Sequence, residues 1–151
     1  LQTRILEKSN NMIIIGIDTG TRTGVAAWDT EKMCYDMITT TTIDKAFLIV
    51  LDYLSRGDVV VRFEDPRHIG GRRERAQGAG SVKRDAAIWE TFLKNNNIRY
   101  QAVRAGSTIT KMDEGYFKAL TGWQNKTSNH ARDAAMMVCG WTENMTKVWE
   151  L

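Results

Sequence analysis

Four side chains spread along the sequence have the chemistry needed to hold a divalent metal ion. Asp18 closes the apolar run IIIGID, and Glu64 closes the run VVVRFE. Adjacent strands lie about 4.8 Å apart, so pairing of these runs would place both carboxylates at one edge of a sheet. His130 and Asp133 are three residues apart in an expected helix, which puts them on one face. The first hypothesis is a site built from Asp18, Glu64, His130 and Asp133.

Such a site suits phosphodiester hydrolysis. Two neighbouring carboxylates repel each other, and a hard cation such as Mg²⁺ relieves the repulsion while keeping several waters. Two ions about 4 Å apart could activate the attacking water and stabilise the leaving oxygen. We therefore expect two Mg²⁺ ions, replaceable by Mn²⁺, with Asp18 between them. His130 would ligate a metal, position the water or transfer a proton. Asp65 competes with Glu64, but alternation puts them on opposite sides of the strand, and Glu64 is preferred.

A mixed sheet is needed to bring these residues together. Apolar β-branched runs predict strands, and apolar residues at helical spacing predict helices. We expect strands at 13–18, 25–29, 33–41, 58–65 and 98–105, and helices at 44–57, 82–97, 112–122 and 130–145, the last of them capped by Asn129. The buried side of the second helix is expected at Ala87, Ile88, Phe92 and Leu93. This order predicts an α/β fold whose five-stranded sheet has three antiparallel strands, then parallel strands, with helices on both faces.

The stretch from Asp18 to Gly20, Asp-Thr-Gly, also occurs in two other kinds of site. Aspartic proteases use it as half of a catalytic dyad, but they are almost entirely β structures, and the long helices expected here argue against them. Actin-like ATPases begin with a similar strand and turn that contact phosphates. They close two such domains on a nucleotide, and 151 residues hold one, so an ATPase fragment ranks last.

The sequence resembles the RuvC family of Holliday-junction resolvases, in the RNase H-like superfamily. GID at 16–18, FED at 63–65 and HARDAA at 130–135 match the family's motifs in order and spacing. The element order matches from Met12 onward. The resemblance implies an RNase H-like sheet and a homodimeric enzyme that cuts four-way junctions. His130 stands where the bacterial family usually has an aspartate, which favours a phage or viral branch and leaves the metal number open.

A basic, glycine-rich segment follows Glu64 and is expected to contact DNA phosphates, with an affinity that falls as salt rises. Clustering of basic residues is the informative feature, because the formal net charge is only +3. Phosphate contacts position a protein on DNA and do not read its sequence. The candidate DNA-binding residues are Arg22, Arg67, His68, Arg72, Arg73, Arg75, Lys83, Arg84, Lys111 and Lys118. Trp123 is a candidate for stacking on a base.

Length and composition narrow the remaining possibilities. We expect residues 12–151 to form a single nuclease domain, with residues 1–11 as an extension or added leader. The two cysteines, Cys34 and Cys139, are far apart and suggest neither a disulfide scaffold nor a zinc site. The apolar runs are too short to span a membrane, so we expect a cytoplasmic protein, in the bacterial host if it is phage-encoded.

The leading hypothesis is a Mg²⁺-dependent endonuclease that resolves four-way DNA junctions as a homodimer. A two-fold enzyme would match the near two-fold symmetry of the junction. Two alternatives stay open: an RNase H-like nuclease acting on another branched DNA or on an RNA–DNA hybrid, and a junction-binding protein whose catalysis His130 has weakened. Neither a membrane nor a small-molecule substrate is expected.

Overall fold

The computed structural model describes residues 11–65, 79–104, 106 and 108–149. Within these ranges one five-stranded sheet has the order β3-β2-β1-β4-β5. Its strands are β1 (Ile13–Asp18), β2 (Thr23–Asp29), β3 (Cys34–Thr41), β4 (Val59–Asp65) and β5 (Tyr100–Arg104). Its helices are α1 (Ile43–Arg56), α2 (Ala79–Asn95), α3 (Glu114–Thr121) and α4 (Asn129–Met136), followed by a 3₁₀ helix at Glu143–Thr146. No helix in the described ranges is long and apolar enough to cross a bilayer.

The central strand of the sheet is β1, which carries Asp18. It pairs antiparallel with β2, and Asp18 lies opposite Gly24. On its other side it pairs parallel with β4, in a register that sets Ile17 opposite Phe63. β2 and β3 are antiparallel, and β4 and β5 are parallel. The expected mixed sheet is therefore confirmed.

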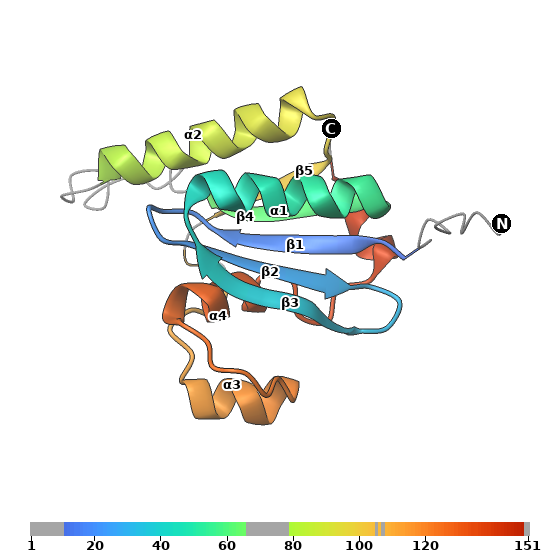
Figure 1. Ribbon diagram of the computed structural model, residues 1–151, viewed down its shortest axis with the longest axis vertical. Helices are drawn as coiled ribbons and strands as arrows, with labels where there is room; N and C mark the ends of the chain where they lie inside the picture. The colour runs from blue at the N-terminus through green and yellow to red at the C-terminus, as the bar shows by residue number, and fades with distance from the viewer. Residues whose placement is uncertain (1–10, 66–78, 105, 107, 150–151) are drawn as a thin grey trace, which may run out of the picture.

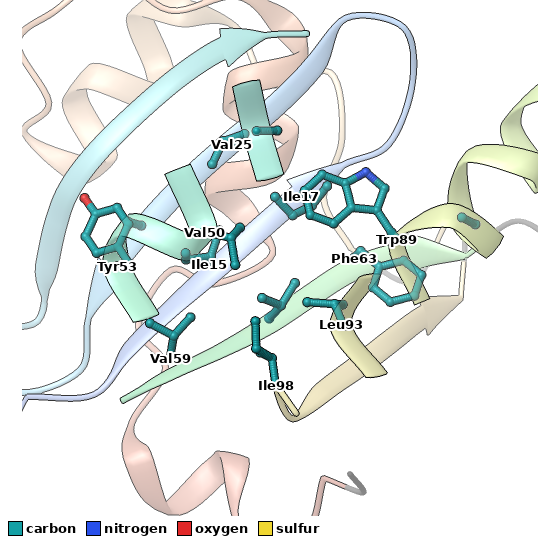
Figure 2. Close-up of a cluster of buried hydrophobic side chains, with 14 residues drawn as sticks. Ile15, Ile17, Val25, Val50, Tyr53, Val59, Phe63, Trp89, Leu93 and Ile98 are labelled. Carbon is teal, nitrogen blue, oxygen red and sulfur yellow. The ribbon is translucent and has the colours of Figure 1, made fainter. Parts of the chain in front are cut away.

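Helices cover the two faces of the sheet in separate layers (Figure 1). Ile15, Ile17 and Phe63 point to one face, where they pack with residues of α1 and α2, including Val50 and Trp89. Figure 2 shows these side chains meeting between the strands and the two helices. The intervening strand residues form a second core with α3, α4 and the C-terminal segment. Side-chain alternation therefore decides which layer each strand residue joins.

The buried face of α2 differs from the expected one. Ala86, Trp89 and Leu93 are fully buried, whereas Ile88 is 41% exposed and Phe92 only half-buried. Ala87 is half-buried as well. The ring of Trp89 lies edge-on to Phe47 of α1, with 4.6 Å between centroids. The helix is oriented so that the Trp89 ring points inward and Ile88 toward solvent, because burial of the larger aromatic ring contributes more to stability than burial of Ile88.

Helix α4 is shorter than expected and begins differently. Ser128, not Asn129, caps it, and its hydroxyl accepts from the backbone N–H of Ala131 at 3.1 Å. The helix ends at Met136, and Gly140 adopts a left-handed conformation with φ of 78°. This conformation turns the chain, so residues expected to continue the helix instead fold back over the sheet. α3 matches its expected position and is capped by the side chain of Asp113.

Candidate active site

The end of β1 and the start of α4 meet at one end of the molecule (Figure 1). His130 Nδ1 lies 2.9 Å from Asp18 Oδ2, a hydrogen-bonding distance, although the two residues are 112 positions apart. The Asp18 side chain is 14% exposed, whereas that of His130 is 53% exposed. This pair therefore joins a largely buried carboxylate to an imidazole that solvent or a ligand can reach.

The surroundings of Asp18 disfavour its ionised form. Burial raises the pKa of the Asp18 carboxyl above its ordinary value, the hydrogen bond and charge of His130 oppose this rise, and the charge of Asp133 adds to it. Asp133 is thus close enough to Asp18 to repel its negative charge. A shifted carboxylate with a like-charged neighbour at a partly open site is a feature of functional sites.

Asp133 is held by a backbone group from a different segment. Its Oδ1 accepts from the N–H of Lys111 at 2.8 Å. Lys111 has a left-handed backbone conformation with φ of 58°, which is uncommon for a residue other than glycine. The segment before α3 therefore passes next to Asp133, whose charge acts on the same Asp18 carboxyl that His130 contacts.

Glu64 and Asp65 point to opposite faces of β4. Asp65 is 1% exposed and shares its side of the strand with Phe63, toward α1 and α2. Glu64 is half-buried and shares its side with Val60, toward α4, and Asp18 shares that side of the sheet with Ile14. The backbone carbonyl of Glu64 accepts from the Thr19 hydroxyl at 3.4 Å, which links the two strand ends. The β1–β4 register and this alternation are what favour Glu64 over Asp65.

Two glycines let α4 approach the sheet closely, and sequence reasoning missed them. A Cβ on Gly24 would lie 2.0 Å from the carbonyl oxygen of His130, and one on Gly16 would lie 2.2 Å from that of Ala134. Because the obstructing atoms belong to the helix backbone, no side-chain adjustment could accommodate a larger residue. Glycine inside a strand is the sequence signal for such an approach. The absence of a side chain at Gly24 therefore permits the close approach of α4 to β2 that places His130 beside Asp18.

The donor types at this end of the sheet fit a hard divalent cation, but they are not gathered around one point. Carboxylate oxygens and an imidazole nitrogen are suitable ligands, and a cation would relieve the repulsion between Asp18 and Asp133. Over the ranges that the structure describes, no three His, Cys, Asp or Glu side chains come close enough together to hold a metal ion. The hydrogen bond with Asp18 engages His130 Nδ1 in this arrangement.

The candidate DNA-binding residues fall into two groups. The residues Arg67, His68, Arg72, Arg73 and Arg75 lie outside the described residues. Of the others, Arg22 is exposed in the turn after Asp18, and Arg84 is exposed on α2. Lys118 pairs with Glu114 on α3 at 3.7 Å. Trp123 is half-buried and packs edge-on against Tyr35, with 6.3 Å between ring centroids, so this ring contributes to the second core.

Comparisons with known proteins bear on the fold. The sequence matches no protein-family model, and no curated protein matches it. The structure is similar to that of T. thermophilus RuvC solved in complex with Holliday junction substrate. The TM-score is 0.63 at 13% sequence identity, and the similarity covers 92% of this chain and 99% of that chain. The chain therefore has a RuvC-like fold.

Proposed function

We propose that this protein is a metal-dependent endonuclease that cuts four-way DNA junctions. The observation that carries the proposal is the contact between Asp18 and His130 where β1 ends, with Asp133 near enough for its charge to act on the Asp18 carboxyl. These residues lie on a fold similar to that of a RuvC solved with Holliday junction substrate. Function depends on the site more than on the fold, so the paired acidic residues weigh most.

In the proposed reaction, Asp18, Glu64 and Asp133 would hold Mg²⁺, with Mn²⁺ as a substitute and two ions as the expected number. The metal would supply Lewis-acid stabilisation of the phosphate and a more acidic water. His130 would accept or donate a proton beside Asp18, or join the ligands, because its imidazole is within hydrogen-bonding distance of that carboxylate. Burial of Asp18 would strengthen its interaction with a cation relative to an exposed carboxylate.

The DNA would lie across the end of the sheet at which β1 and β4 terminate. Arg22, in the turn four residues after Asp18, and Lys111, whose backbone contacts Asp133, are candidate phosphate contacts beside this site. Lys83 and Arg84 on α2, together with Lys118, would extend the contact area. We further propose a homodimer, because a two-fold protein would place two sites on a near two-fold junction. The histidine at position 130 is the feature that favours a phage or viral type.

A nuclease assay tests this function. Wild-type protein, Asp18→Asn and Asp52→Asn are incubated with a labelled four-way junction, a flap, an RNA–DNA hybrid and a linear duplex, in Mg²⁺, Mn²⁺ or EDTA. Asp52 is an exposed carboxylate on α1, so its replacement removes the same charge away from the site. We expect metal-dependent nicking of the junction by wild-type protein and Asp52→Asn only. Equal cutting of the linear duplex would contradict junction selectivity, and sedimentation as a monomer at high concentration would contradict the dimer.

The second candidate function is junction binding without efficient cleavage. The lack of a gathered set of three metal donors among the described residues favours it. In the same assay, tight junction binding without metal-dependent nicking would support this candidate and contradict the nuclease. Preferential cutting of the hybrid or the flap would instead indicate a related nuclease with a different substrate.

A further inference from the structure

Arg132 lies between His130 and Asp133 in the sequence, but its side chain is buried, with 7% exposed. Its Nε donates to the carbonyl of Met112 at 2.7 Å, and its Nη1 donates to the carbonyl of Thr127 at 2.6 Å and to the Thr127 hydroxyl at 3.0 Å. Its Nη2 donates to the side chain of Asn129. A buried guanidinium must be satisfied in this way, and here its acceptors connect two segments, the chain at Met112 and residues 127–129 at the start of α4.

Asp133 contacts the same neighbouring segment as Arg132. Asp133 accepts from the N–H of Lys111, and Arg132 donates to the carbonyl of Met112, the next residue. Two consecutive residues of α4 thus bind a donor and an acceptor on two consecutive residues of the other segment. Lys111 has the left-handed backbone conformation, which is unfavourable for a residue with a side chain unless surrounding contacts impose it.

We propose that Arg132 is a positioning residue for the nuclease site. It holds the Lys111–Met112 backbone against α4, so that the Lys111 N–H fixes the orientation of the Asp133 carboxylate. Groups that orient a metal ligand commonly change metal affinity or activity about tenfold or more when they are removed. The effect on metal binding rests on the proposed function. The holding of Lys111 does not, because it depends only on hydrogen bonds within the chain.

A purely stabilising role is the competing explanation, and a second arginine provides the control for it. Arg62 of β4 donates from Nε to the side chain of Gln101 in β5 at 2.7 Å, and from Nη1 to the carbonyl of Met137, which caps the C-terminal end of α4. Its guanidinium also lies 4.2 Å from the centre of the Trp141 ring. Loss of Arg62 would therefore disturb α4, but it would remove no contact described for Lys111 or Asp133.

The test compares Arg132→Met, Arg132→Lys and Arg62→Met in the full chain. Amide hydrogen exchange is followed by NMR without metal, and the rate at Lys111 is compared with that at Ile15 in the central strand. Mn²⁺ affinity is then measured by calorimetry, and junction cleavage and junction binding are measured separately. Arg132→Lys guards against failure of Arg132→Met to fold, since it keeps the charge but cannot reproduce the guanidinium's planar array of donors.

We expect both Arg132 variants to accelerate exchange at Lys111 about tenfold relative to Ile15 and to weaken Mn²⁺ binding about tenfold. We expect Arg62→Met to leave both values within about twofold of wild type. In the Arg132 variants we expect junction cleavage to fall with little change in junction binding. Unchanged relative exchange, or equal effects in Arg62→Met, would overturn the proposal. Faster exchange with unchanged Mn²⁺ affinity would also overturn it. If wild-type protein neither binds Mn²⁺ nor cuts junctions, the proposed function fails, while the exchange data still test how Lys111 is held.

Discussion

Replacement of Gly24 by alanine should damage the site more than the fold. The new Cβ would lie 2.0 Å from the His130 carbonyl oxygen, whereas ordinary contact begins at 3.4 Å, so the start of α4 must retreat by about 1.4 Å along that direction. Displacement of a reacting group by about 1 Å can cost about 100-fold in rate. Overpacking of this kind typically lowers stability by about 1–3 kcal/mol. We therefore expect junction cleavage to fall about 100-fold in a protein that still folds.

The assay measures the single-turnover rate of junction cleavage and the free energy of unfolding in urea for each variant. Ile15→Val is the matched control, because Ile15 is fully buried on the opposite face of the same sheet, toward α1 and α2. It should cost about 1 kcal/mol of stability while leaving cleavage within about twofold. The reasoning would be refuted if Gly24→Ala cut at the wild-type rate, or if Ile15→Val lost as much activity at equal stability.

Three further changes test other parts of the site. Burial raises the pKa of Asp18 in the folded protein, so the stability that its protonated carboxyl contributes is present below the ordinary pKa of 3.8 and is lost as pH rises through the folded pKa. Asp18→Asn should therefore become more stable relative to wild type as pH rises from below 3.8, measured by urea unfolding, and a pH-independent difference would contradict this. His130→Ala should lower turnover about 100-fold with little loss of junction binding, and unchanged turnover would exclude His130 from the site. Ser128→Ala should cost about 1 kcal/mol in thermal unfolding through loss of the α4 cap, and no change would show that Asn129 can replace it.

The sheet and the meeting of Asp18 with His130 could be predicted because both follow from strong local patterns. The apolar run ending at Asp18 predicts a buried strand, and strand order then limits where a later helix can pack. Period-two alternation likewise separates Glu64 from Asp65 without any knowledge of their contacts. Such inferences need only the direction of a side chain relative to its own element.

Predictions failed where contacts between elements decide the outcome. Ile88 and Trp89 are adjacent and both apolar, so periodicity alone does not determine which of them turns inward; packing against Phe47 determines it. The two-residue spacing between His130 and Arg132 shows only that the Arg132 side chain points away from that of His130. It does not reveal the acceptors of Arg132, because Met112 is distant in sequence and Thr127 lies outside the helix. Gly16 gave a usable signal, since glycine within a predicted strand suggests a close backbone approach, whereas Gly24 precedes the predicted strand and lies inside β2 in the structure.

The long separation between Asp18 and His130 has a consequence for synthesis of the protein on the ribosome. Chains emerge N-terminal end first, at about 5–20 residues per second, and structure can form as they do so. The strands, α1 and α2 all precede residue 105, so that side of the sheet can pack early, while the face that α4 covers must wait. Ile14, Ala26, Trp28 and Val60 would then stay open to chaperones or other chains until α4 emerges. The same delay means that the nascent chain cannot assemble the proposed site before residues 128–136 have been made.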